Sequence, residues 1–178
     1  MKNQIHPFFT GLFLVVLLST INLSKIEAQS VRVKTYYSED WDNWEADGHK
    51  IKTVYSEDWD NWEYQIDGQS GRIKTYNSED WDSWEIIGSN TLRLKTVYSE
   101  DWDNWECGDL RLKTVYSEDW DNWEVTGNGV SIRIKTYYSE DWDNWEISGD
   151  LSSLSTEQKA AVYFIPIFVA SIHKQGIN

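Results

Sequence analysis

The sequence is poor in cysteine and in basic residues, and each shortage excludes a class of protein. The single cysteine, Cys107, rules out an intramolecular disulfide and a cysteine-based zinc site. The 16 basic residues stand against 30 acidic ones, and the formal net charge of -14 repels nucleic-acid phosphates and anionic lipid headgroups. We therefore expect no nucleic-acid partner. An intrinsically disordered acidic tail is also excluded, because the chain holds 12 tryptophans and 10 tyrosines.

The first 28 residues have the layout of a secretory signal peptide. Lys2 precedes an apolar run over 8–21, and a polar stretch then ends at the small residue Ala28. The apolar run is short for a membrane span, and no stop-transfer pattern follows it. We predict cleavage after Ala28 and no transmembrane span in the mature chain. The predicted location is secreted, at the cell surface or in the periplasm.

Six copies of one motif occupy most of the remaining chain. The segment KTYYSEDWDNWE and its near copies start at intervals of 18 to 22 residues, at Lys34, Lys52, Lys74, Lys95, Lys113 and Lys135. The first half of each copy alternates apolar or β-branched residues with basic ones, which predicts a strand of about six residues. The second half predicts a shorter strand. The Ser-Glu-Asp between them predicts a single helical or 3₁₀ turn.

Equivalent positions of the six copies form columns, and three columns are predicted to form the core. These are the columns of Val33, Thr35 and Trp44, which share one face of the two predicted strands. The same alternation places the Tyr37 column on the apolar face. The Lys34 column is predicted to face outward.

These patterns predict an all-β repeat protein of six two-stranded units, each about 20 residues long. One such unit cannot bury its own apolar face, so the units must associate. We expect a short β-solenoid, which tolerates joins of unequal length as surface loops. A β-trefoil-like six-hairpin fold is the alternative, although the spacing here repeats after three units. A propeller is third, because a four-stranded blade needs about twice this period.

The chain is predicted to have three parts. They are the signal peptide at 1–28, a six-repeat β domain at 29–150 and a helical tail at 151–178. The repeat units are predicted to start near residues 31, 49, 71, 92, 110 and 132.

The tail, residues 151–178, breaks the repeat and predicts one helix. Ser155 and Gln158 match a capping box, which starts the helix at Thr156. Pro166 is predicted to kink or end it near Ile165. We expect the tail to cap the open end of the last repeat, because a bare edge strand aggregates. The alternative is an insertion element for a membrane or a partner.

Four acidic residues recur in every unit, and they suggest calcium as a possible ligand. In a solenoid, equivalent acids would stack about 4.8 Å apart and repel each other by about 1 kcal/mol in water. Ion pairs from the Arg/Lys columns to Glu45 or Glu39 would offset this repulsion. Calcium would also offset it, since carboxylate and amide oxygens at close spacing suit that ion. The candidate ligands are Asp40, Asp42, Glu45, Asp58, Asp60 and Glu63, and no other cofactor is expected.

The first tryptophan of each motif is a candidate ligand-binding residue. Aromatic rings beside carboxylates suit sugars or quaternary ammonium groups. In length and aromatic content the units resemble the choline-binding repeats of bacterial cell-surface proteins. They lack the Gly-Trp opening and the Trp-Tyr-Tyr run of those repeats, so no binding residue carries over. The candidates are Trp41, Trp59, Trp81, Trp102, Trp120 and Trp142. The alternative is structural, with Trp44 in the core and Trp41 over the turn.

An enzyme is the least expected class. Beyond the leader the histidines are His49 and His173, which lie outside the common motif, and Cys107 occupies an apolar column that indicates an unreactive core residue. Six near-identical acid sets also lack the asymmetry that acid–base catalysis uses. We predict a secreted non-enzymatic repeat protein, a structural or adhesive binding module with an extracellular carbohydrate or protein partner. The alternative is a carbohydrate- or choline-type binder acting through the Trp/acid motifs.

Overall fold

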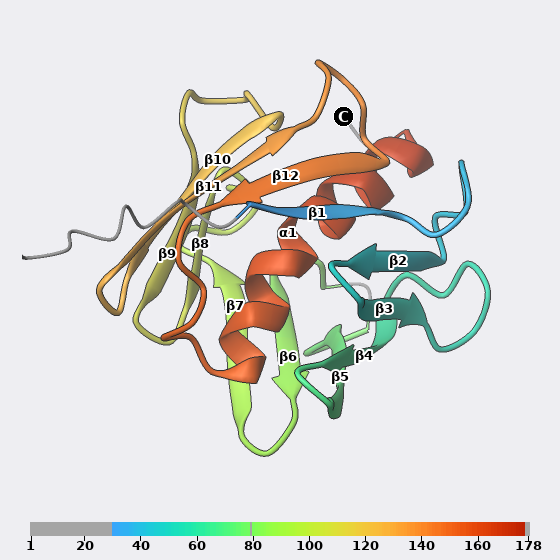
Figure 1. Cartoon of the computed structure of the whole chain (residues 1–178), viewed down its shortest axis with the longest axis horizontal. Coiled ribbons are helices and arrows are strands. Elements are labelled where there is room, and N and C mark those ends of the chain that lie inside the picture. The colour runs from blue at the N-terminus through green and yellow to red at the C-terminus, as the bar shows by residue number, and fades with distance from the viewer. Residues whose placement is uncertain (1–29, 79, 177–178) are drawn as a thin grey trace, which may run out of the picture.

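The computed structural model describes residues 30–78 and 80–176, which form a closed antiparallel β-barrel with a helix inside it (Figure 1). Each strand pairs with its neighbours in the chain, and β1 pairs with β12 to close the ring. The strands are β1 (Ser30–Thr35), β2 (Asn43–Ala46), β3 (His49–Thr53), β4 (Asn61–Ile66), β5 (Gln69–Thr75), β6 (Ser83–Ile87), β7 (Thr91–Thr96), β8 (Asn104–Cys107), β9 (Leu110–Thr114), β10 (Asn122–Gly127), β11 (Val130–Thr136) and β12 (Asn144–Ser148). The helix is α1 (Thr156–Gln175). The predicted signal peptide lies outside the described residues.

The predictions of a β-solenoid and of a β-trefoil-like fold are both wrong, because all twelve strands belong to one barrel. The physical reason lies at the joins between units. Asp47 and Gly48 have φ angles of 49° and 84°, and Asn128 and Gly129 have 49° and 76°. Two successive positive φ angles are typical of a two-residue type I′ hairpin turn. Such a turn returns the chain antiparallel beside the strand it has left, so consecutive units lie side by side.

The predicted core columns are confirmed, except for the tyrosines. The columns of Val33, Thr35 and Trp44 are buried in all six units. Burial alternates strictly along β1, so Lys34 faces outward. The prediction for Tyr37 is wrong, because β1 ends at Thr35 and the tyrosine ring is 67% exposed.

Helix α1 fills the lumen of the barrel, as Figure 1 shows. An eight-stranded barrel is roughly the size that its own side chains just fill, so twelve strands leave space for another element. Every residue over 160–172 is buried, and the helix therefore has no solvent face within that segment. The Phe164 ring lies 4.8 Å from that of Trp84, and the Phe168 ring lies 4.8 Å from that of Trp105.

The helix begins as predicted and otherwise differs from the prediction. The N–H of Gln158 donates to Ser155 Oγ, and its side chain accepts from the N–H of Ser155, which confirms the capping box and the start at Thr156. Pro166 was predicted to kink or end the helix near Ile165. The helix does not end there, because α1 continues to Gln175. Packing on all sides outweighs the one missing N–H. The predicted capping role is also wrong, because a closed barrel has no open edge to cover.

The outer wall carries alternating basic and acidic columns. Lys34 lies opposite Glu45 in the register, with Nζ 3.0 Å from Oε1. The same Lys–Glu pair recurs in every unit at 2.9 to 3.3 Å. Equivalent residues of adjacent units lie two strands apart, roughly 10 Å. The repulsion expected of stacked acids is therefore weaker, and ion pairs compensate the Glu45 column.

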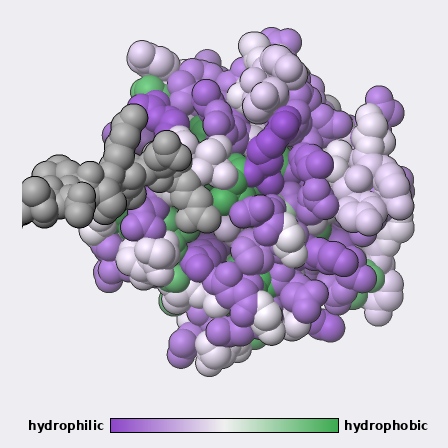
Figure 2. All heavy atoms as spheres, viewed as in Figure 1, coloured by the Kyte–Doolittle hydropathy of each residue, from purple (hydrophilic) through white to green (hydrophobic). Residues whose placement is uncertain are grey.

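The face of the molecule in Figure 2 is mostly hydrophilic, with small hydrophobic areas. This agrees with an apolar helix that lies inside the barrel. No helix within residues 30–78 and 80–176 has the length and hydropathy that crossing a membrane requires.

Candidate functional site: the acidic loop rim

Six equivalent loops meet at one end of the barrel, and we call this end the loop rim. The loops are residues 36–42, 54–60, 76–82, 97–103, 115–121 and 137–143. They contain eighteen of the chain's 30 acidic residues and no lysine or arginine. The last turn of α1 brings His173 and Lys174 to the same end, where they contact Trp142 and Trp41.

Each loop consists of two successive β-turns rather than the predicted helical turn. In the first loop the N–H of Asp40 donates to the carbonyl of Tyr37 at 3.0 Å, and the N–H of Asn43 donates to the carbonyl of Asp40 at 3.1 Å. The N–H of Tyr36 donates to the carbonyl of Asn43 at 2.8 Å and closes the loop. Two β-turns reverse the chain between adjacent strands, which a single helical turn would not do.

The glutamate of each described loop has a left-handed backbone conformation. The φ angles lie between 59° and 62° at Glu39, Glu57, Glu100, Glu118 and Glu140. This conformation costs a non-glycine residue roughly 1–2 kcal/mol. Repeated strain of this kind is typical of positions that the surrounding contacts hold and that serve a function.

The second aspartate of a loop binds the next loop, an arrangement we call the loop clamp. The Asp42 carboxylate accepts hydrogen bonds from Ser56 Oγ at 2.7 Å, the N–H of Glu57 at 3.0 Å and Trp59 Nε1 at 3.3 Å. Burial raises the pKa of Asp42, but these hydrogen bonds outweigh it and lower the pKa below its usual value. The clamp recurs at Asp82 and Asp103, so it joins neighbouring units and holds the strained glutamate.

The two tryptophans of each motif are joined by a hydrogen bond. Trp44 Nε1 donates to the carbonyl of Trp41 at 2.8 Å, and the same bond forms in all six units. The Trp44 column is buried in the core, and the Trp41 column is partly buried and packs against it. The predicted ligand-binding tryptophans therefore form the part of the loop rim that packs against the core.

The predicted calcium ligands of one unit do not converge. Both oxygens of Asp40 accept from Asn43 Nδ2 at 2.9 Å, Asp42 forms the loop clamp, and Glu45 lies on the outer wall paired with Lys34. In the described parts of the chain no three His, Cys, Asp or Glu side chains are grouped for a metal ion.

The second predicted set has the same arrangement. Asp58 and Asp60 occupy the corresponding positions of the second loop. Glu63 lies on the outer wall, where its carboxylate is 2.9 Å from Lys52 Nζ.

Exposed tyrosines are the feature of the loop rim that the alternation pattern missed. The five most exposed are Tyr37 at 67%, Tyr55 at 71%, Tyr98 at 71%, Tyr116 at 69% and Tyr138 at 68%. The third loop has Asn77 in their place. The neighbouring Ser-Glu-Asp was the available signal, because turn residues end a strand and the face alternation with it.

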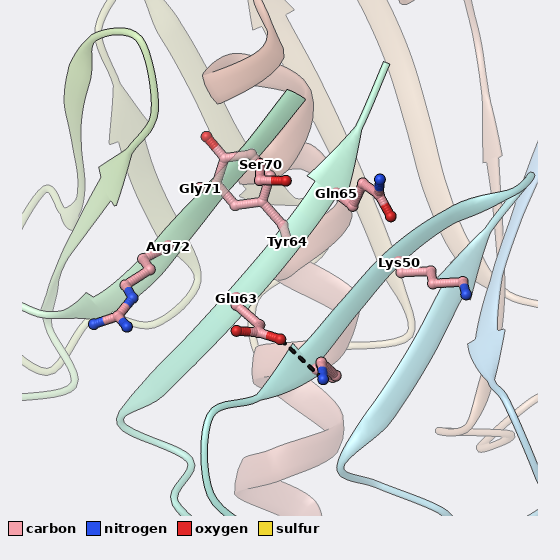
Figure 3. Close-up of a pocket in the computed structure, with 8 residues that line it drawn as sticks. Lys50, Glu63, Tyr64, Gln65, Ser70, Gly71 and Arg72 are labelled. Atoms are coloured by element: carbon pink, nitrogen blue, oxygen red, sulfur yellow. Dashed lines mark ion pairs between the residues drawn. The ribbon is translucent and has the colours of Figure 1, made fainter. Parts of the chain in front are cut away.

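Two depressions of the described surface bear on function. The larger, about 630 Å³, lies on the loop rim between the fifth and sixth units, beside Trp120, Trp142 and His173. The smaller, about 450 Å³, lies on the outer wall over β3, β4 and β5 (Figure 3). In the smaller one Glu63 forms an ion pair with Lys52 and lies opposite Arg72 in the register, so the charges of this depression are partly compensated.

Cys107, the one cysteine, has no chemistry to contribute. Its side chain is fully buried, and burial raises the pKa of the thiol to about 12. A thiol in this state is not a nucleophile near neutral pH.

Comparison with protein-family models, curated proteins and solved structures finds no match for the chain. The interpretation of the loop rim therefore depends on its own geometry.

Proposed function

We propose that this chain is a secreted, non-enzymatic binding module that holds a positively charged polypeptide on its loop rim. One observation supports this above the others: the five most exposed tyrosines lie on the loop rim, whose six loops carry eighteen acidic residues and no lysine or arginine. Carboxylates attract a basic partner at long range, and tyrosine rings contribute contact area and cation–π attraction. Tyrosine is also enriched where protein interfaces concentrate their binding energy.

The rigidity of the loop rim supports the same proposal. The loop clamps hold successive loops in one arrangement, so little conformational entropy is lost when a partner binds. The six near-identical loops also suit a partner with repeated positive charges, because several weak contacts then act together. An extracellular location is proposed from the leader, whose pattern is that of a signal peptide.

The test is binding of a fluorescently labelled ten-lysine peptide, measured by anisotropy, with a ten-glutamate peptide as the negative control. We expect the lysine peptide to bind, and its affinity to fall as salt rises. A variant with serine in place of the five tyrosines should bind about tenfold more weakly or worse, because exposed cation–π contacts contribute about 0.5–1 kcal/mol each. The five positions are Tyr37, Tyr55, Tyr98, Tyr116 and Tyr138.

A charge control separates the loop rim from the net charge of the protein. Asp47, Asp109 and Asp150 are exposed acids at the opposite end of the barrel. Their triple change to asparagine should leave peptide affinity within about twofold of wild type, apart from a small long-range effect. Lack of binding at low salt would refute the proposal. Equal binding by the tyrosine variant, or an equal loss in the control, would refute the assignment to the loop rim.

A further inference from the structure

The depression between the fifth and sixth units, which we call the rim hollow, differs from the two junctions that precede it in the chain. At the preceding junctions Trp102 Nε1 donates to Asp82 and Trp120 Nε1 donates to Asp103, each at 2.8 Å. The equivalent bond from Trp142 to Asp121 is not among the hydrogen bonds of the described residues. The rim hollow of about 630 Å³ lies at this junction.

The end of helix α1 lies at this junction. The Trp142 ring lies against the His173 ring, with centroids 4.7 Å apart and planes 32° apart. Asp121 still accepts from Ser139 Oγ at 3.4 Å and from the N–H of Glu140 at 3.2 Å. Its Oδ1, however, is buried and accepts no hydrogen bond from any described residue. A carboxylate in this position favours a nearby positive charge.

The lining of the rim hollow supplies acceptors and rings but no lysine or arginine. Glu118 and Glu140 are exposed at its border, and Asp121, Trp120 and Trp142 line it. Carboxylates form their strongest hydrogen bonds with charged N–H donors, and indole rings attract cations to their faces. Because carboxylates outnumber indole rings in this lining, the rim hollow favours a cation that carries N–H donors.

The next junction shows how this protein uses a similar position itself. Between the sixth and first units, Trp41 Nε1 is buried without a hydrogen-bond partner among the described residues, so the clamp bond is missing there too. Here the chain supplies its own cation, because Lys174 Nζ lies 5.8 Å from the centre of the Trp41 ring. The fifth and sixth units have no such lysine in the lining of their junction.

We infer that the rim hollow binds a primary ammonium group, the side chain of a lysine from the partner. The inference rests on the proposed function, since it names the residue type that the loop rim holds at one defined position. The ammonium N–H groups would donate to Glu118 and Glu140, and its charge would compensate Asp121. The faces of Trp120 and Trp142 would contact the alkyl chain and the cation.

The test uses n-butylammonium as the probe and the indole N–H signals in ¹H–¹⁵N NMR spectra of the whole mature chain as the readout. Trp120→Phe and Trp142→Phe variants assign the two signals. We expect these two signals to shift and saturate, and tetramethylammonium, which has no N–H donor, to bind at least about tenfold more weakly. Equal affinity for tetramethylammonium, or equal shifts of all rim indoles, would overturn the inference.

The repeats provide a matched control. The double variant Glu118→Gln, Glu140→Gln should weaken butylammonium binding about tenfold. The double variant Glu57→Gln, Glu100→Gln changes the same loop position away from the rim hollow, and it should leave butylammonium affinity within about twofold. An equal effect of the two variants would overturn the inference.

Failure of the inference and failure of the proposed function give different results. If the ten-lysine peptide binds and butylammonium does not, the rim hollow is not an ammonium site and the proposed function stands. If butylammonium binds and the peptide does not, the site stands and the proposed function is wrong.

Discussion

The central position of α1 predicts that Phe168→Ala will destabilise the protein strongly. The Phe168 ring is 2% exposed and lies 4.8 Å from Trp105, 5.9 Å from Trp102 and 6.0 Å from each of Trp81 and Trp84. A core phenylalanine-to-alanine change costs about 3–5 kcal/mol. We expect about 4 kcal/mol, because Trp84 and Trp105 lie on β6 and β8, and Trp81 and Trp102 lie on the loops before these strands, so the indoles are held by a closed barrel and cannot collapse together into the space left behind.

The measurement is equilibrium denaturation in guanidinium chloride, followed by tryptophan fluorescence and by circular dichroism. In a thermal melt the same loss corresponds to a decrease in Tm of about 8–16 °C for a chain of this size. Tyr37→Ala is the control, because its ring is 67% exposed and the cost should stay within about 0.5 kcal/mol. A loss below about 1 kcal/mol for Phe168→Ala would refute the placement of α1 in the lumen.

Four further predictions concern single residues or added ions. Glu157→Ala should cost about 1–3 kcal/mol at pH 7, because the buried carboxylate accepts from Asn90 N–H and Ser89 Oγ. Burial raises the pKa of Glu157, but these hydrogen bonds outweigh it and lower the pKa overall. The stability lost in Glu157→Ala should therefore shrink as the pH falls below about 4.3, the usual pKa of a glutamate, and denaturation at several pH values measures this. Glu100→Gly should keep Tm within about 2 °C of wild type, because φ at this position is 60° and glycine adopts it without steric cost. Glu100→Val should lower Tm, and equal Tm values for the two variants would contradict the backbone strain at Glu100. Leu112→Asp should leave the chain unfolded by circular dichroism, since the position is 0% exposed, and a near-normal melt would contradict the core. Calcium, magnesium and chelator at equal ionic strength should give the same Tm, and a rise with calcium alone would reveal a bound ion.

The local structure of this protein could be predicted from the sequence because it depends on neighbouring residues. Alternation along the motif identified the buried columns of Val33, Thr35 and Trp44 and the outward Lys34. The Ser155 capping box identified where the helix starts. The ion pair between the Lys34 and Glu45 columns followed from their positions on adjacent strands.

Two features of the sequence are typical of the barrel rather than of a solenoid. Asp-Gly and Asn-Gly pairs at the joins, such as Asp47-Gly48, are typical of tight hairpins and so of side-by-side units. The apolar run over 160–172 has no polar face, which is typical of a helix surrounded by protein. The solenoid interpretation gave the tail an end to cap and so concealed this second feature.

Only the tertiary structure decided how the units close and what the loops present. Pairing of β1 with β12 joins residues more than 100 positions apart, such as Val33 and Trp145, and no local pattern specifies that pairing. Closure creates a lumen that α1 fills, and it gathers the six loops at one end. It also places the last turn of α1 against Trp142 and Trp41, which belong to the sixth and first units. Six copies that are nearly identical in sequence thus become different in structure, since one helix cannot contact all of them equally.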